Sequence, residues 1–248
     1  MPCMTAWLDP LRKALDESDT FIDFFFRDDD VGWATGEFRA LLACFRRCSV
    51  PLDIAAIPNV LTTELADEIC TLHAQSPAFL GVHQHGFAHT NHEVSGRKCE
   101  FGASRPYQDQ YRDIKRGKIQ LDAMLGSVLD PIFTPPWNRC TETTAECLSE
   151  LGFRVLSRDA TASSFGLSGL KELPISIDWF AKKNGERLSF QSLGRLIANT
   201  VKQTQQVGIM MHHELMNTDE RDRLNDLLFL LWTHRQTRCK LMAEMAAV

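Results

Sequence analysis

Short runs of strand-forming residues alternate with longer helical stretches along the chain, and this alternation restricts the fold more than any other feature. FIDFFF (21–26) and VGIMMH (207–212) are typical of buried strands, whereas residues 37–48 and 109–125 carry apolar side chains at helical spacing. Strands that are separated by helices pair in parallel through right-handed crossovers. We therefore expect an α/β fold, either a barrel or a doubly wound sheet.

The same pattern predicts the order of the elements. The predicted strands cover residues 21–26, 51–58, 79–84, 132–136, 153–157, 173–178 and 207–212. The predicted helices cover residues 37–48, 62–75, 109–125, 142–151, 190–205 and 221–240. No Gly/Ser-rich linker or charge block interrupts them. We expect one domain over residues 1–248, with a core at about 21–215 and a C-terminal helix at 221–240.

Polar clusters at the strand ends favour the barrel. They are RDDD (27–30), HQHG (83–86), TPPWN (134–138), SRD (157–159), IDW (177–179) and MHH (211–213). Barrel enzymes collect their chemistry from many strand ends, whereas a doubly wound sheet concentrates it at one switch point. We predict a distorted (β/α) barrel with about seven parallel strands.

Composition excludes several classes of function. The net charge is −5, and no basic stripe is available to bind phosphates, so we expect no nucleic-acid partner and a neutral or cationic small substrate. No run of eighteen apolar residues predicts a membrane span, and the start lacks an export signal. The eight cysteines form no CxxC pair. These features predict reduced thiols and a cytoplasmic location, and they leave the oligomeric state open.

Two clusters suggest a metal. Asp28, Asp29 and Asp30 are adjacent carboxylates at a strand end, where a bound cation or a polar turn would relieve their repulsion. His85 and His89 stand four residues apart, so on one helical turn they could hold a single ion.

Other histidines in these stretches have different expected roles. We expect His83 and His92, which flank this pair, to be structural or supporting residues. His212 and His213, at a late strand end, are candidates to protonate a leaving group.

The ordered set of Asp cluster, HxxxH, Pro-Pro-Trp and late strand-end histidine resembles the polysaccharide deacetylase family of metal-dependent carbohydrate esterases. The resemblance covers about residues 21–215. It implies a distorted barrel that removes N- or O-acetyl groups with a divalent ion. It also implies Asp29 as the catalytic base and Asp30, His85 and His89 as the metal ligands, although Asp28 and Asp29 could be base and ligand instead.

The remaining motifs of the family match less closely. Thr134 stands at the position that is usually arginine, so Arg139 or Arg27 would have to orient the base. The resemblance further implies that Asp178 supports the site and that Trp179 walls it. Trp33 and Trp137 could stack on a sugar. The final motif fits either His212 or His213 as the acid, and we favour His212.

The leading hypothesis is a metal-dependent deacetylase that acts on a carbohydrate or related small molecule, with one divalent ion. Zn²⁺ is favoured, and Co²⁺, Ni²⁺ or Mn²⁺ are alternatives. A hydrolase of other non-peptide, including cyclic, C–N bonds is the first alternative function. A non-catalytic barrel that binds metal or glycan is the second.

Overall fold

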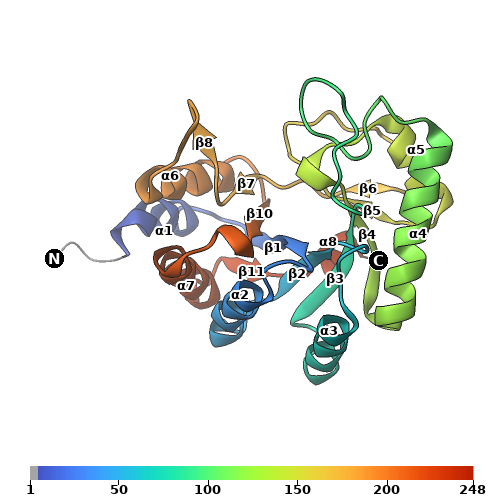
Figure 1. The fold of residues 1–248 in the computed structure, drawn as a ribbon. Coiled ribbons are helices and arrows are strands. Elements are labelled where there is room, and N and C mark those ends of the chain that lie inside the picture. The colour runs from blue at the N-terminus through green and yellow to red at the C-terminus, as the bar shows by residue number, and fades with distance from the viewer. Residues whose placement is uncertain (1–4, 248) are drawn as a thin grey trace.

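Nine strands form one parallel sheet that curls into a barrel, with helices on its outer surface (Figure 1). The computed structural model describes residues 5–247. The strands are β1 (Ile22–Val31), β2 (Leu52–Ala56), β3 (Leu80–His85), β4 (Leu129–Thr134), β5 (Val155–Leu156), β6 (Lys171–Glu172), β7 (Ile177–Asp178), β10 (Gln206–His212) and β11 (Thr237–Cys239). Their order is β6-β5-β4-β3-β2-β1-β10-β7, and β11 pairs with β1. The predicted barrel is confirmed, with more strands than the expected seven.

Residues 171–179 join the two edges of this sheet, where the sequence predicts a single strand at 173–178. β6 pairs with β5 at one edge, and β7 pairs with β10 at the other. Between them, the Ile175 N–H donates to the Arg158 carbonyl (2.7 Å), and the Ser176 N–H donates to the Gly208 carbonyl (2.9 Å). One extended segment therefore bonds to both edges in turn, which splits the predicted strand in two.

The helices on the outside, apart from the first, begin close to their predicted positions. They are α1 (Asp9–Asp16), α2 (Thr35–Cys48), α3 (Thr63–Gln75), α4 (Tyr107–Leu125), α5 (Glu142–Glu150), α6 (Phe190–Val201) and α7 (Thr218–Thr233). Side-chain caps account for several starts. The Thr62 hydroxyl accepts from the Leu65 N–H, and the Asn217 amide oxygen accepts from the Glu220 N–H. None of the helices within residues 5–247 has the length and apolar character to cross a membrane.

The expected C-terminal helix at 221–240 is too long. The helix α7 ends at Thr233, and residues 237–239 form β11 beside the start of β1. The backbone of Ile22–Phe24 offers hydrogen-bonding groups that only another strand can satisfy, and this tertiary pairing outweighs helical continuation. The sequence also did not predict α1, α8 (Met242–Ala246) or the antiparallel hairpin of β8 (Lys182–Lys183) and β9 (Glu186–Arg187).

The strand β1 separates two apolar regions. Phe24 and Phe26 pack outward in the large cluster beneath the helices, whereas Phe25 belongs to a second cluster inside the barrel. That inner cluster includes Met242 and Met245, so side chains of α8 pack against the inner face of the strands. Because side chains alternate along a strand, residues 27 and 29 of β1 share the inner face with Phe25. This alternation positions the site described next.

Candidate metal and catalytic site

Asp30, His85 and His89 meet above the barrel at the carboxyl ends of β1 and β3. The Asp30 Oδ1 atom lies 3.1 Å from His85 Nε2 and 3.1 Å from His89 Nε2. One ligand atom from each residue lies within 4.8 Å of the others. Although burial opposes ionisation, hydrogen bonds from His85 and His89 hold the pKa of Asp30 well below its usual range. One carboxylate oxygen and two imidazole nitrogens thus converge on one point.

Backbone geometry aims these side chains. Asp30 has a left-handed φ of 67°, which turns its carboxylate away from the alternation of β1 and toward the barrel mouth. His85 ends β3, and its Nδ1 lies 3.0 Å from the Thr134 carbonyl oxygen. This contact leaves the other ring nitrogen, Nε2, facing Asp30. A bond from one ring nitrogen to a backbone carbonyl is usual for a histidine whose other nitrogen binds a metal.

His89 reaches the site through a turn and not along a helix, so the expected helical pairing is wrong. Gly86 and His89 both have a φ of 54°, and the residues between β3 and α4 contain no helix. The buried carboxylate of Glu100 holds this turn, because it accepts the N–H of Phe87 at 3.2 Å and that of Ala88 at 2.7 Å. The two imidazole rings then lie 5.3 Å apart.

Asp28 and Asp29 point to opposite faces of β1 and therefore have different partners. Asp29 faces the barrel interior, where both its oxygens accept from Arg27, at 2.7 Å from Nε and 2.9 Å from Nη2. Asp28 faces the helices, where it accepts from the His213 N–H at 2.9 Å and lies 2.8 Å from His213 Nδ1. Asp29 is therefore the carboxylate beside Asp30 that opens to the site.

Arg27 is fully buried and contacts Asp29, the expected base, in the way that the resemblance implies for an arginine at position 134. Its guanidinium also donates to Ser157 Oγ at 2.7 Å and to Asn138 Oδ1 at 2.6 Å. Burial raises the pKa of Asp29, but the charge and hydrogen bonds of Arg27, together with the charges of His85 and His212, outweigh burial and lower this pKa below its ordinary value. Thr134 instead contacts His83, with 2.9 Å between Oγ1 and Nε2.

Arg139, the other arginine expected to orient the base, contacts a different group. An Nη1–H of Arg139 donates to the Lys98 carbonyl at 2.9 Å, and no contact joins Arg139 to Asp29 among residues 5–247. Burial lowers the pKa of His83 to about 3, so this histidine is neutral. His92 is exposed, and its backbone N–H donates to the Cys99 carbonyl.

The adjacent histidines at the end of β10 differ sharply in their surroundings. His213 is buried against Asp28. Burial lowers the pKa of His213, but the charge and hydrogen bond of Asp28 and the hydrogen bond to the Trp33 carbonyl together outweigh burial and raise it to about 9. His212 is partly exposed, and its Nε2 lies 3.7 Å from Asp30 Oδ2. Asp29 and His212 are register partners on β1 and β10. Within the described part of the chain, the buried Nδ1 of His212 has no hydrogen-bond partner.

A pocket of about 320 Å³ opens beside these groups. Asp29, His212, Asp178 and Trp137 line it. Trp137 has a φ of 56°, and its ring centroid lies 4.4 Å from that of His89. Trp33 lies on another side of His89, at 5.3 Å. Both tryptophans thus border the metal-ligand cluster.

The geometry places Trp179 away from this pocket. Its indole N–H donates to Glu220 Oε2 at 2.6 Å, and its ring packs edge-on against Trp7. The next residue, Phe180, lies beside His212, with ring centroids 6.4 Å apart. The backbone N–H of Phe180 donates to Asp178 Oδ1 at 2.8 Å, which fixes that carboxylate at the pocket.

Two residues that the sequence analysis did not single out support the cluster. Glu100 shapes the His89 turn, and Asn138, with a left-handed φ of 57°, contacts Arg27. The turn-forming TPPWN stretch signals an unusual backbone at Asn138. No pattern in the sequence identifies Glu100, because its partners are backbone groups twelve and thirteen residues earlier.

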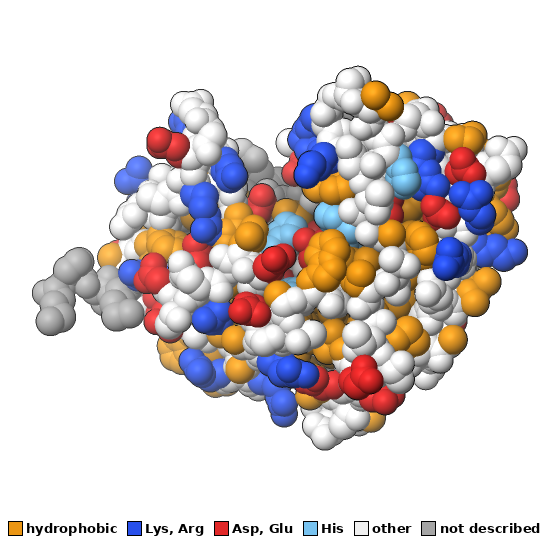
Figure 2. All heavy atoms as spheres, viewed as in Figure 1, with side chains coloured by type: hydrophobic (Ala, Val, Ile, Leu, Met, Phe, Trp, Pro, Cys, Tyr) orange, Lys and Arg blue, Asp and Glu red, His pale blue; other side chains and the backbone are white. Residues whose placement is uncertain are grey.

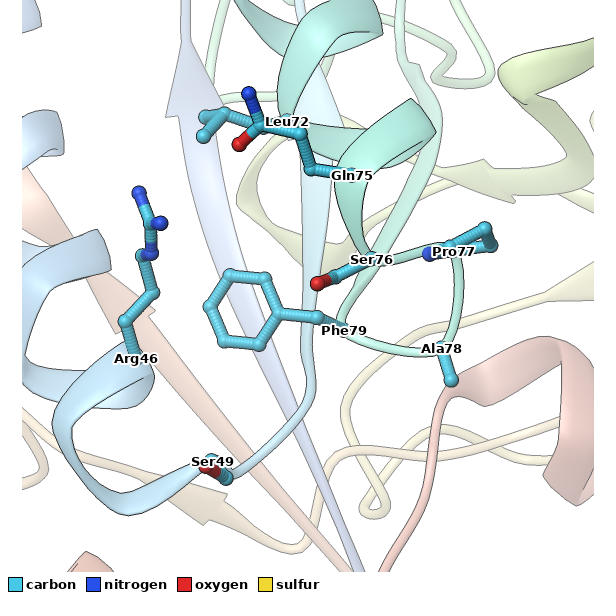
Figure 3. Close-up of a pocket in the computed structure, with 8 residues that line it drawn as sticks. All are labelled: Arg46, Ser49, Leu72, Gln75, Ser76, Pro77, Ala78 and Phe79. Carbon is cyan, nitrogen blue, oxygen red and sulfur yellow. The ribbon is translucent and has the colours of Figure 1, made fainter.

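A separate cavity of about 400 Å³ lies at the opposite end of the barrel, between the carboxyl ends of α2 and α3 (Figure 3). Phe79 and Leu72 contribute apolar surface to it. Arg46 is the one charged residue among the eight described residues that line it. It contains no group of ligands or catalytic side chains comparable to the cluster at Asp30.

Comparison with solved structures agrees with this fold. A proposed polysaccharide deacetylase from Mycobacterium smegmatis superposes with a TM-score of 0.69 at 14% identity, over 93% of this chain and 91% of that one. A family 4 acetyl xylan esterase from Clostridium thermocellum, solved with a cobalt ion, gives 0.60 at 12% identity, over 91% and 90%. A family 4 pseudoenzyme from Bacillus anthracis gives 0.59 at 9% identity, over 92% and 66%.

No sequence profile of a protein family matches the chain, and no curated protein matches it significantly. The structural likeness nevertheless extends over about nine-tenths of the chain. The chain therefore has the fold of the polysaccharide deacetylases and family 4 carbohydrate esterases.

Proposed function

We propose that this protein is a metal-dependent hydrolase that removes an acetyl group from a nitrogen or oxygen atom of a carbohydrate or related small molecule. The observation that carries this proposal is the meeting of Asp30, His85 and His89 within 4.8 Å, beside a pocket that Asp29 and His212 line. The solved structures of similar fold, among them a proposed polysaccharide deacetylase and an acetyl xylan esterase, support the same class of reaction.

The donor set fits one divalent ion. Asp30 would supply a carboxylate oxygen, and His85 and His89 would each supply Nε2. This combination suits Zn²⁺ and also Co²⁺, Ni²⁺ or Mn²⁺, and one relative was solved with cobalt. When bound, such an ion lowers the pKa of water and polarises a carbonyl oxygen. The choice of zinc stays a prediction.

Asp29 is suited to accept a proton from the attacking water. Arg27 keeps this carboxylate ionised and engages both its oxygens, which fixes its plane. His212, on the neighbouring strand, is suited to give a proton to the departing nitrogen or oxygen. Trp137 offers a face for a sugar ring, and Asp178 an acceptor for its hydroxyl groups.

Two other functions use the same site. A hydrolase of cyclic or other non-peptide C–N bonds would need the same ligands, base and acid. A non-catalytic barrel would keep only the ligands, and the pseudoenzyme among the relatives gives this alternative a precedent. The Arg27–Asp29 pair favours an enzyme, because a barrel that only binds metal has no need of an ionised, oriented base. The cytoplasmic location stays a prediction.

The direct test combines metal content with acetate release. Protein loaded with Zn²⁺ or Co²⁺ should release acetate from an N-acetylhexosamine or an acetylated sugar ester, and chelation should abolish this release. His85→Ala should lose both bound metal and activity, while His92→Ala, an exposed histidine of the same loop, should keep both. Ring opening of a cyclic amide without acetate release would favour the first alternative, and metal binding without any hydrolysis would favour the second.

A further inference from the structure

We infer that the pocket contains an anion subsite in which Arg97 and Arg139 receive an acidic group of the substrate. This inference rests on the proposed function, because it concerns what the same pocket selects. Both arginines line the pocket together with Asp29 and His212. An acidic group at this subsite would therefore hold the rest of the substrate near the reacting groups.

The two guanidinium groups retain unused binding capacity. Among residues 5–247, neither Arg97 nor Arg139 forms an ion pair with a carboxylate, unlike the buried Arg27 and Arg158 of the same barrel. Arg139 donates only to a neutral acceptor, the Lys98 carbonyl at 2.9 Å. A guanidinium carries five N–H donors in a planar fork, so most of those of Arg139 stay free for a carboxylate or phosphate.

Three carboxylates also line the pocket, but none of them forms an ion pair with Arg97 or Arg139 among residues 5–247. Arg27 already neutralises Asp29 beneath them. The Oδ1 atom of Asp159 accepts from the backbone N–H and the hydroxyl of Thr161, at 2.8 and 2.5 Å. The Oδ1 atom of Asp178 accepts from the Phe180 N–H at 2.8 Å. Burial and the nearby charge of Arg97 lower the pKa of Arg139, which shows that the two cations feel each other.

The cationic character extends beyond the two arginines. Lys98 Nζ lies 6.0 Å from the ring centroid of Trp137, a residue of the pocket wall. Figure 2 shows a hollow with histidine at its base and with Lys or Arg side chains on both of its sides. The exposed Lys182 and Lys183 of the β8–β9 hairpin extend from the side opposite the 86–106 loop (Figure 1).

This local arrangement reverses the expectation of a neutral or cationic substrate, which came from the net charge of −5. Net charge sums over the whole surface, whereas a bound group responds to charges within about a Debye length, roughly 8–10 Å. Arg97 and Arg139 therefore act on a group bound in the pocket more strongly than the acidic residues of remote faces do. The substrate class that fits is an acetylated sugar that carries a carboxylate or a phosphate.

The test measures binding separately from turnover. The probes are N-acetylglucosamine, its 6-phosphate and its 6-carboxylate, 2-acetamido-2-deoxyglucuronate, titrated into the zinc-loaded and metal-free protein by calorimetry. We expect at least one charged probe to bind about tenfold more tightly than the neutral sugar at low salt, and the preference to shrink as salt rises. The two charged probes show whether the subsite takes carboxylate or phosphate.

Variants localise the effect. Arg97→Gln and Arg139→Gln should each reduce the preference several-fold, and the double variant should remove it. Arg154→Gln is the matched control, because Arg154 is exposed just before β5, at the opposite end of the barrel, and should leave the preference unchanged. Circular dichroism and thermal unfolding would verify that Arg139→Gln still folds. Arg97→Gln tests the inference independently, because Arg97 is an exposed residue.

Each outcome separates the inference from the proposed function. Equal binding of charged and neutral sugars, or a preference that survives the double variant, would overturn the anion subsite even if acetate is released. A charged-sugar preference that is lost in the double variant, with no acetate released under any metal, would support the subsite and count against the deacetylase.

Discussion

Arg27 and Asp29 lie two residues apart on the inner face of β1, and the guanidinium of Arg27 engages both carboxylate oxygens of Asp29, at 2.7 and 2.9 Å. Both side chains are buried, so the pair is shielded from solvent. A single strand thus supplies the proposed base, the cation that lowers its pKa and, one residue later, the carboxylate of Asp30, the proposed metal ligand. Substitutions can therefore test the roles of these three residues one at a time.

Replacement of Arg27 should change the pH profile of the reaction. Arg27→Lys keeps the charge but loses the two-point contact, so the pKa of Asp29 should rise. Because Asp29 must be ionised to act as a base, the acidic limb of kcat/KM should move to higher pH, and kcat should fall about tenfold or more. Arg39→Lys, which alters an exposed two-point pair with Glu68, should change neither. An unmoved acidic limb would contradict the role given to Arg27.

The two histidines of β10 should separate stability from activity. His213→Ala would leave Asp28 buried without its partner, which should cost about 3–5 kcal/mol of unfolding free energy in urea titrations. His212→Ala removes a partly exposed side chain, so it should lower kcat by about 10²–10⁴ with little loss of stability. If His212→Ala proved the less stable variant and His213→Ala kept the metal but lost turnover, the two assignments would have to be exchanged.

Glu100 should control metal affinity without touching the metal. In Glu100→Gln, one amide NH₂ would face backbone N–H donors that now bond to the carboxylate, so the turn carrying His89 should loosen. We expect zinc affinity to fall about 10–100-fold in a chelator competition, the range typical of supporting residues. Glu146→Gln, an exposed change on α5, serves as the control. Unchanged affinity in Glu100→Gln would mean that the turn is held by other contacts.

Asp53 should make the folded protein less stable as the pH rises. Asp53 Oδ2 accepts from the Met242 N–H at 2.9 Å, while the buried Oδ1 has no partner among residues 5–247. Burial raises the pKa of Asp53 well above its ordinary value of 3.8. A raised pKa in the folded state means that stability is full below the unfolded value and is lost as the pH rises through the folded value.

Asp53→Asn should therefore be more stable than the unmodified protein at pH 8, by about 1–3 kcal/mol, and similar to it near pH 4. Thermal unfolding over this pH range measures the difference. Asp67→Asn, an exposed change on α3, should show no such trend. A stability gap that does not widen with pH would rule out ionisation of Asp53 as its cause.

The metal-ligand cluster shows how far local patterns reach. The sequence analysis singled out the aspartate cluster and the His85/His89 pair because polar residues at parallel strand ends meet on one rim of a barrel, and the family resemblance implied Asp30 as the ligand among the three aspartates. It gave the wrong reason for the histidine pair, since a turn held by Glu100, and not a helix, brings His89 to His85. The spacing in a chain limits which residues can meet, but backbone dihedral angles decide how.

The choice between Asp28 and Asp29, and between His212 and His213, depended on which face of β1 and β10 points into the barrel. Both faces of β1 are buried, and three consecutive phenylalanines leave no alternation to read. The outward packing of Phe24 and Phe26 and the inward packing of Phe25 set that phase. The sequence pattern also could not show that Phe180, and not the neighbouring Trp179, lies beside His212.

The sequence by itself determined the parallel barrel and the residues able to bind a metal, because hydrophobic periodicity and residue chemistry are local properties. Only the tertiary structure decided that Arg27 faces Asp29, that Met242 and Met245 of α8 pack against the inner face of the strands, and that Arg97 and Arg139 line one pocket. These relationships join groups by strand phase and by contacts between distant segments. They arise when the sheet closes, because only then do side chains from different strands come within hydrogen-bonding or electrostatic range.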